Sequence, residues 1–398
     1  MVELIGKYTK ANIMTDIVDE ETISQVYSFL NQEIFKDAKI VIMPDCHKGA
    51  GTVIGFTMTL KDFVIPNMIG VDIGCGIEAY KIGKVDIDFA DFDRYLKNNI
   101  PSGSNIRNTK PPIKRDNRDF NERLNKALDN LNSDYNGKYK ADFDRVAHSI
   151  GTLGGGNHFI EIDVDNDDNK YLVIHSGSRN LGKRIAEFYQ HKAVDYIKKH
   201  KINGVEKGLE YLFISDKLGN DYLEDMKTAQ EYAMLNRKTM AFVLLKYFKN
   251  IKDNIIMDDH FFKDVESIKS IHNYINFQDK IIRKGAIASN NGEKVIIPLN
   301  MRDGSIIATG KSNADWNNSA PHGAGRILSR SKAKEKLLIE DFEESMTGVW
   351  SSCIKKETID ESPMAYKPKE EILNFINDTV TVDFIMKPIY NFKASDDY

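Results

Sequence analysis

Apolar residues recur at two spacings along the chain, and the alternation between these spacings predicts an α+β fold. Apolar positions three and four residues apart predict helices over 22–36, 121–133, 141–150, 183–200, 216–249, 339–346 and 368–378. Short apolar runs between Gly, Pro and Asn predict strands over 39–43, 52–60, 77–82, 159–164, 171–174 and 379–386, with further short strands and turns over 279–310. We expect the first strand to stop at Pro44 and the Pro-, Asn- and Lys/Arg-rich stretch 101–120 to form a loop.

The chain of 398 residues is long enough for one large domain or for two to three ordinary ones. No internal repeat and no linker long enough to separate domains interrupts the alternating pattern. The sequence therefore predicts a single large mixed domain over residues 1–398, with glycine-rich turns at the ends of its strands.

The net charge of −4 gives the chain no overall basic character. If the protein binds nucleic acid, it must do so through a local basic patch. The candidates in the predicted loop are Arg107, Lys110, Lys114, Arg115 and Arg118. Such a cluster is more often a solvated surface than a binding groove.

Nothing in the sequence predicts a membrane protein. No run is as long and apolar as a membrane span, and the first residues lack the pattern of a signal peptide. Three scattered cysteines do not suggest a disulfide framework. We therefore expect a cytoplasmic protein with reduced thiols.

Several glycine-rich turns at the ends of predicted strands present side chains of the types that bind metals. A thiolate can bridge two divalent ions, a carboxylate adds a hard oxygen ligand, and imidazoles complete the coordination, so this set fits a two-metal centre. Each member also has a purely structural interpretation, as a buried thiol, a turn-forming carboxylate or a core histidine. The candidates are Asp72, Cys75, His158, His175 and His272.

Residues 320–326 place a histidine between two turns of small residues. Gly323 and Gly325 have no side chain, so their N–H groups can approach a phosphate closely. We expect a helix to start directly behind them and to add positive potential. The neutral imidazole of His322 would then be placed to attack phosphorus, although a packed histidine in a turn is the alternative interpretation.

Seven motifs, in this order, resemble the RtcB family of RNA-splicing ligases. The likeness extends from about residue 40 to Lys393 and implies the mixed α+β architecture of that family, with a central cleft for metals and nucleotide. The motifs are MPDCHKGAG (43–51), GVDIGCG (70–76), GGGNHFIEI (154–162), HSGSR (175–179), HN (272–273), RKGA (283–286) and HGAGR (322–326).

The resemblance also implies a role for individual residues. His322 looks like the nucleophile that takes GMP from GTP as a phosphoramidate, and Asp45 is similar to a carboxylate involved in proton transfer. Two manganese ions are implied, with Cys75 bridging them, Asp72 and His158 on one ion, and His175 and His272 on the other.

Contacts to the nucleotide and to phosphate are implied as well. Arg179 and Arg326 resemble arginines that grip phosphates, which suits the bidentate geometry of the guanidinium group. The positions that resemble guanylate contacts are Asn157, Glu161, Asn300, Ser305, Gly323, Ala324, Gly325 and Lys393.

The sequence departs from the family pattern at two of these positions. Asn300 stands where a serine is expected, although its amide can still form hydrogen bonds. Five residues follow Lys393, whereas family members end just after the lysine. The geometry of the nucleotide pocket is the feature that these changes affect.

The leading hypothesis is a ligase dependent on GTP and manganese. It would join RNA ends that carry a 3′-phosphate or 2′,3′-cyclic phosphate to 5′-hydroxyl ends, in tRNA splicing or RNA repair, with an archease-type activator as a possible partner. One alternative is a two-metal phosphohydrolase or nuclease acting on RNA ends, which would use a hydroxide nucleophile and need no covalent histidine. Another is a protein that binds RNA ends without catalysis.

Overall fold

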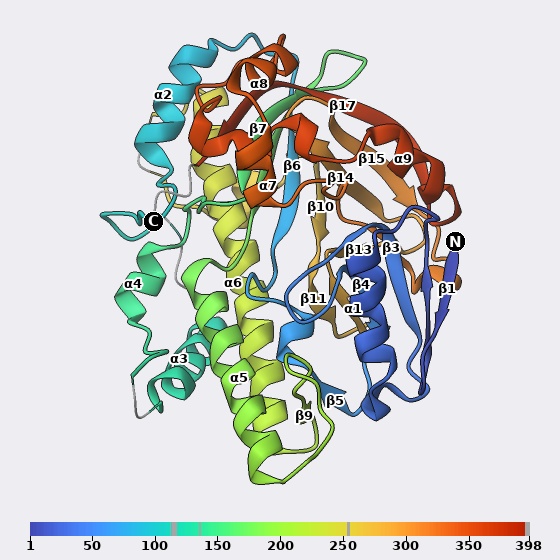
Figure 1. Cartoon of the computed structure of the whole chain (residues 1–398). Helices are drawn as coiled ribbons and strands as arrows, with labels where there is room; N and C mark the ends of the chain where they lie inside the picture. The colour runs from blue at the N-terminus through green and yellow to red at the C-terminus, as the bar shows by residue number, and fades with distance from the viewer. Residues whose placement is uncertain (112, 114–117, 135–136, 253–254, 395–398) are drawn as a thin grey trace.

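Two large sheets form the centre of the fold (Figure 1). The computed structural model describes residues 1–394, apart from 112, 114–117, 135–136 and 253–254. Within these residues, a six-stranded sheet has the order β1 (Val2–Ile5), β2 (Lys10–Ile13), β3 (Ile40–His47), β4 (Ile54–Thr59), β12 (Ile281–Lys284) and β11 (Asn273–Asn276).

The second large sheet carries most of the strands that end at the candidate site. As far as the structure describes the chain, it has seven strands in the order β10 (Ser267–Ile271), β6 (Gly76–Gly83), β8 (Lys170–Ser176), β7 (Phe159–Val164), β17 (Val380–Lys393), β15 (Gly304–Gly310) and β14 (Lys294–Asn300). Two small sheets pair β13 (Ala286–Ala288) with β16 (Ser319–Pro321), and β5 (Phe63–Val64) with β9 (Leu212–Phe213).

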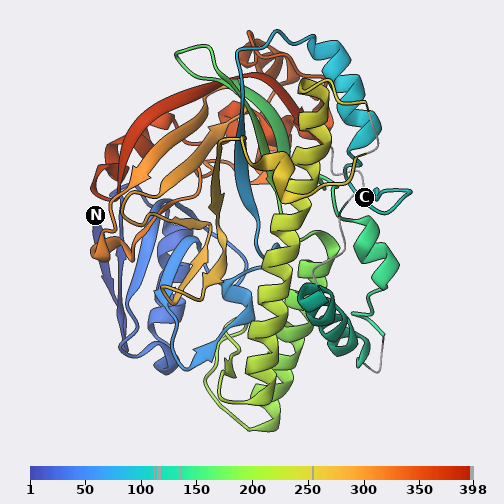
Figure 2. The same cartoon turned by 180° about the vertical axis from the view of Figure 1, so that it is seen from behind.

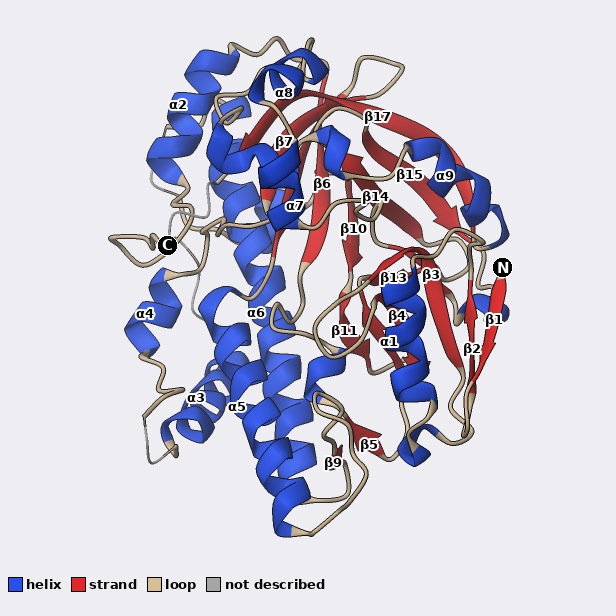
Figure 3. Cartoon of the chain, viewed as in Figure 1, coloured by secondary structure: helices blue, strands red, loops and turns tan. Residues whose placement is uncertain are grey.

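Most helical residues gather on one side of these sheets (Figure 3). The longest helix runs along the sheets as a continuous rod in the view from behind (Figure 2). The α-helices are α1 (Glu20–Leu30), α2 (Phe89–Asn99), α3 (Arg118–Asn132), α4 (Phe143–His148), α5 (Arg179–Lys199), α6 (Lys217–Phe248), α7 (Arg330–Lys336), α8 (Ile339–Ser345) and α9 (Lys369–Phe375). Short 3-10 helices are η1 (Glu33–Phe35), η2 (Pro66–Met68), η3 (Asp259–Phe262), η4 (Ala314–Trp316), η5 (Lys356–Glu361), η6 (Pro363–Ala365) and η7 (Ile376–Asp378).

The α+β class predicted from the spacing of apolar residues is confirmed. Helix α6 shows the physical reason, because its apolar end over residues 240–245 is buried against the seven-stranded sheet, where it contacts β6 and β8. Among the described residues, no helix combines the length and the apolar character that crossing a bilayer requires.

Three predicted boundaries next to the candidate site are wrong. Strand β3 continues through Pro44 to His47, because the pairing with β4 is irregular between Ile42 and His47 and needs no N–H from proline there. Strand β17 extends to Lys393, well beyond the predicted end at residue 386. Helix α7 begins only at Arg330, so no helix starts directly behind Gly323 and Gly325.

Candidate active site

A cleft of about 310 Å³ brings together most of the predicted site residues. Four of them, Asp45, His158, Arg179 and Ser305, do not line it. Those that line the wall are Asp72, Cys75, Asn157, Glu161, His175, His272, Asn300, His322, Gly323, Ala324, Gly325, Arg326 and Lys393.

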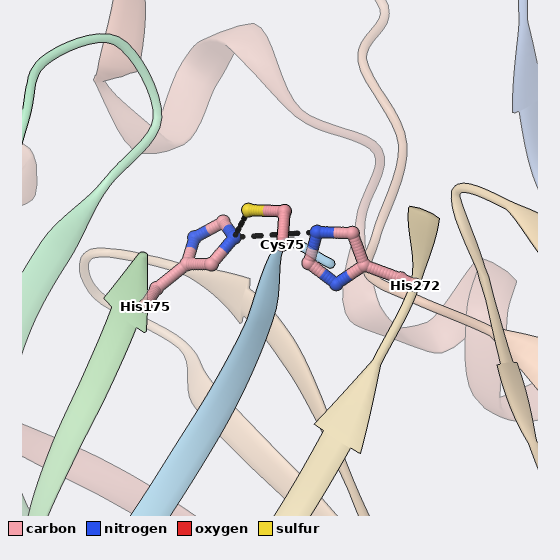
Figure 4. A group of neighbouring side chains, drawn as sticks. All are labelled: Cys75, His175 and His272. Carbon is pink, nitrogen blue, oxygen red and sulfur yellow. Dashed lines mark hydrogen bonds between the residues drawn. The ribbon is translucent and has the colours of Figure 1, made fainter. Parts of the chain in front are cut away.

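The five predicted metal ligands converge in two triads that share one thiol. Cys75, His175 and His272 form one triad, and Asp72, Cys75 and His158 form the other, each with its ligand atoms within 4.8 Å of one another. In Figure 4 the two imidazoles of the first triad point toward each other beside the sulfur. This is the arrangement expected of a thiolate that bridges two ions.

The register of the seven-stranded sheet explains why these side chains meet. Strands β10, β6, β8 and β7 are consecutive neighbours. His175 pairs with Ile77 of β6 on one side and with Phe159 of β7 on the other, so the residues that precede β6 and β7 lie beside it. His272 follows β10, whose last residue pairs with Gly76. The ends of these four neighbouring strands therefore bring the ligands together.

Helix α6 holds the turns that carry these ligands. The buried Arg237 guanidinium donates to the carbonyl oxygen of Gly74 at 2.9 Å and to that of Ser176 at 2.8 Å. Asn236 accepts from the backbone N–H groups of Gly151 and Thr152. The sequence analysis assigned no role to either residue, because nothing in the helical pattern distinguishes them from other polar positions of α6.

Hydrogen bonds to the backbone fix how the histidines face the cluster. His158 Nδ1 lies 2.9 Å from the carbonyl oxygen of Leu153, and His175 Nδ1 lies 3.1 Å from that of Asn157. A carbonyl only accepts, so each Nδ1 donates to it and each Nε2 faces the cluster, where it can bind a cation. Metal-binding histidines are commonly oriented in this way.

The central atoms of the cluster lie close together without a proton arrangement that satisfies them all. His175 Nε2 is 3.4 Å from His272 Nε2, and Cys75 Sγ is 3.3 Å from His175 Nε2. His272 Nδ1 is buried and has no hydrogen-bond partner among the described residues. Facing lone pairs repel each other, and a cation between them removes that repulsion, so the residues fit bound metal ions.

The pKa values of the two buried histidines and of Asp72 favour the forms that bind metals, whereas that of Cys75 does not. Burial, reinforced by the neighbouring imidazoles, holds the pKa values of His175 and His272 well below the usual range, so both rings are neutral. Burial raises the pKa of Asp72, but the contact with His158 outweighs it and lowers that pKa to about 2. Burial and the Asp72 charge raise the pKa of the Cys75 thiol, which a bound cation would reverse.

His322 lies beside this cluster with its ring oriented by a buried carboxylate. Its Nδ1 is 2.6 Å from Asp45 Oδ2, which also accepts from the His322 backbone N–H at 3.2 Å. Asp45 is fully buried on β3, whereas His322 follows β16 and its ring centroid is 4.9 Å from that of His272. Gly325, at φ +76°, makes this contact possible, because a Cβ there would lie 2.4 Å from the Asp45 carbonyl oxygen.

The wall of the cleft also contains an ionic network centred on Glu361. Lys393 Nζ lies 2.6 Å from Glu361 Oε2, and Arg326 Nη1 lies 3.2 Å from Glu361 Oε1. The Tyr366 hydroxyl donates to the same carboxylate at 2.8 Å. Glu361 and Tyr366 were missed in the sequence analysis, because both lie in short irregular segments without a recognisable pattern.

Asn300 and Arg179 form hydrogen bonds with other parts of the chain, and Ser305 is buried outside the lining of the cleft. Asn300 organises a turn, accepting from the backbone N–H groups of Arg302 and Asp303. Ser305 is fully buried, and its Oγ has no hydrogen-bond partner among the described residues. Arg179 donates to Thr152 Oγ1 and to the Gly103 carbonyl oxygen.

The basic loop is only partly described. Arg107 donates to the carbonyl oxygen of Asn99 at 3.1 Å, so it is tied to the backbone. Lys110 lies 3.4 Å from Asp144, and Arg118 is exposed at the start of α3. Lys114 and Arg115 lie outside the described residues.

The fold and the cleft define a class of α+β protein in which a candidate metal centre lies next to a histidine whose ring is oriented by a carboxylate. The sequence model of the tRNA-splicing ligase RtcB family matches residues 30–394. The RNA-splicing ligase RtcB of Escherichia coli K12 is 32% identical over 383 residues, covering 89% of this chain and 90% of that protein. The tRNA-splicing ligase RtcB of Nanoarchaeum equitans is 29% identical over 411 residues, covering 84% and 83%. The chain belongs to the RtcB family.

Proposed function

We propose that this protein is an RNA ligase that uses GTP and manganese to join a 3′-phosphate or 2′,3′-cyclic phosphate end to a 5′-hydroxyl end. The observation that carries the proposal is that His322, whose ring lies 2.6 Å from Asp45, stands in a cleft that four of the five candidate metal ligands also line. Membership of the RtcB family supports the same activity.

In the first step His322 acts as the nucleophile toward GTP. Asp45 accepts from Nδ1–H, which leaves the Nε2 lone pair free to attack the α-phosphorus. A phosphorus–nitrogen bond forms while the bond to pyrophosphate breaks, giving GMP linked to His322. We assign Asp45 an orienting role in this step, in addition to the proton transfer that the family resemblance implies.

Other residues of the cleft bind the nucleotide in this proposal. Arg326 and Lys393 supply positive charge, and Gly323, Ala324 and Gly325 supply backbone close to the phosphate. Asn157, Glu161 and Asn300 line the cleft and would contact the guanylate, whereas Ser305 and Arg179 do not line it.

The metal ligands of the proposed site are Asp72, Cys75, His158, His175 and His272, with the thiolate shared. Two bound manganese ions would supply Lewis-acid neutralisation of the charge that develops on the phosphates. The role of the protein side chains is to hold this site rigidly beside His322, whose ring is packed against His272.

The later steps transfer GMP to RNA. The RNA 3′-phosphate, formed by opening a cyclic phosphate where one is present, attacks the phosphorus bound to His322 and releases the imidazole. The 5′-hydroxyl of a second RNA end then attacks the activated 3′-phosphate, GMP leaves, and a 3′–5′ phosphodiester remains. We further propose that residues 1–398 act as one ligase domain in the cytoplasm, where thiols stay reduced, and that an archease-type activator assists.

The phosphohydrolase alternative gains no support from the cleft. A hydrolase of that kind would use hydroxide as the nucleophile, so it would need neither a histidine nor a carboxylate to orient it. The His322–Asp45 contact and the family membership both favour ligation.

The test is covalent labelling with GTP carrying a labelled α-phosphate, with and without manganese. We expect an acid-labile label on the parent protein and none on His322→Asn. The matched control is His47→Asn, because His47 also lines the cleft and is not one of the proposed metal ligands. A label that persists in His322→Asn, or that depends on His47 instead, would contradict the proposal.

A ligation assay then tests the substrates. RNA oligonucleotides with a 3′-phosphate and a 5′-hydroxyl should yield a joined product that requires GTP, whereas a 3′-hydroxyl donor should not react. Release of phosphate without a joined product would favour the hydrolase instead.

A further inference from the structure

Four side chains converge on the carboxylate of Glu361: two arginines, a tyrosine and a lysine. Its Oε1 accepts from Arg326 Nη1 at 3.2 Å and lies 2.8 Å from Arg330 Nη1. Its Oε2 accepts from Lys393 Nζ at 2.6 Å and from the Tyr366 hydroxyl at 2.8 Å. All five side chains line the cleft in which His322 lies.

Most of this network is buried, and its cations outnumber its carboxylates. The side chain of Glu361 is 3% exposed and that of Lys393 is 6% exposed. Burial would raise the pKa of Glu361, but Lys393, Arg330 and Arg326 outweigh it and lower that pKa to about 2. The adjacent Asp360 pairs with Arg330 at 2.6 Å, so two carboxylates face three cations.

We propose that Glu361 is a positioning residue that holds Lys393 and Arg326 in place for the incoming nucleotide. The inference rests on the proposed function, because the two cations that Glu361 holds in place belong to the proposed guanylate site. Glu361 acts through the two cations and does not itself touch the reacting atoms.

The reason lies in the flexibility of the side chains that Glu361 restrains. A lysine has four rotatable side-chain bonds, and ordering it only when the ligand binds costs conformational entropy and weakens affinity. Lys393 is the last residue of β17, and its ammonium group also lies 5.3 Å from the centre of the Phe159 ring. The salt bridge to Glu361 fixes that ammonium group before the nucleotide arrives, while the excess positive charge remains available for an anionic ligand.

The first measurement compares Glu361→Gln with the parent protein. We expect the Kd for GMP, measured by calorimetry, to rise about tenfold, which is the effect of losing one charge-assisted hydrogen bond. The guanylylation rate at saturating GTP should change by less than about threefold, because the His322–Asp45 pair is untouched. Glu361→Asp keeps the charge and should recover part of the affinity. Glu357→Gln, in the same 3-10 helix but exposed, should bind GMP like the parent.

A double-mutant cycle with Lys393→Met separates positioning from general damage to the fold. If Glu361 acts through Lys393, Glu361→Gln should weaken GMP binding by less than about threefold when Lys393 is already absent. Equal loss in both backgrounds, or no loss in either, would overturn the inference.

A third measurement does not depend on GTP and stays informative if a variant is unstable. Acylation of Lys393 by an amine-reactive ester, quantified by peptide mass spectrometry in the folded protein, should be slow in the parent. It should be at least about fivefold faster in Glu361→Asp, whose shorter side chain loosens the contact with the ammonium group. Unchanged Lys393 reactivity would refute the positioning role, whereas failure of the parent to be labelled by GTP would refute the proposed function instead.

Discussion

Replacing Asp45 by asparagine should slow guanylylation strongly while leaving the shape of the cleft unchanged. The amide has the same shape, so its oxygen can still accept from His322 Nδ1–H at the 2.6 Å position, but the negative charge is lost. A hydrogen bond to a charged group contributes about 1.5–3 kcal/mol, and this range corresponds to about 10- to 150-fold in rate. If the amide turns its NH₂ toward Nδ1, the ring takes the other tautomer, Nε2 carries the proton, and the loss is larger.

The substitution should also lower the free energy of unfolding, through the second oxygen of the Asp45 carboxylate. Asp45 Oδ1 is buried without a hydrogen-bond partner among the described residues, so an NH₂ group placed there would be buried and would need a new acceptor. An unsatisfied buried donor costs about 1–3 kcal/mol, and thermal unfolding should report that decrease.

The assay is single-turnover labelling from α-labelled GTP at saturating nucleotide and manganese, at a temperature where both proteins are folded. Asp16→Asn, at an exposed position outside the cleft, is the control for a general effect of removing a carboxylate. A labelling rate in Asp45→Asn equal to that of the parent would refute the idea that Asp45 orients the nucleophile.

Three further predictions follow from the cleft and its surroundings. Cys75→Ala should lose both metal ions, as measured by elemental analysis, and should not be guanylylated; two ions per chain in that variant would exclude bridging by the thiolate. Burial raises the pKa of Glu161 to about 7, against the opposing effect of Lys393. If its carboxylate accepts guanine N–H groups, GMP affinity should increase from about pH 6 to pH 8, and Glu161→Gln should remove that increase in calorimetry. Lys110→Ala with Arg118→Ala should weaken RNA binding and reduce the log–log salt slope by about 0.7 for each lost phosphate contact, whereas an unchanged slope would exclude the loop.

The sequence predicted the strands and turns of the site more reliably than the contacts between them. Cys75 and His175 were expected at strand ends, and both lie there, because short apolar runs bounded by glycine are a local signal. The grouping of the metal ligands came from the family resemblance, since spacing along the chain does not reveal which strand ends are neighbours. The structure adds the register that brings them together.

What the sequence missed depends on contacts between distant residues. Glu361 and Lys393 are 32 residues apart, and Asp45 and His322 are 277 apart, so no local pattern reports either pair. The unexpected length of β17 has the same origin, because its pairing with β7 extends the strand to Lys393. The helix expected behind Gly325 does not form there, because the backbone of this segment pairs with residues 365 and 366 instead: Arg326 forms a β-bridge with Tyr366, and the Ile327 N–H donates to the Ala365 carbonyl oxygen.

The candidate site lies where the two large sheets meet, and this position explains how its parts depend on one another. His272 joins β10 of the seven-stranded sheet to β11 of the six-stranded sheet. Its N–H donates to the Cys75 carbonyl oxygen at 2.9 Å, and its own carbonyl accepts from Gly285 at 2.7 Å. Asp45 belongs to the six-stranded sheet, so the orientation of His322 and the geometry of the metal ligands are set by different sheets. Ions bound at the shared thiol would therefore link the two sheets and fix the distance between the nucleophile and the metal centre.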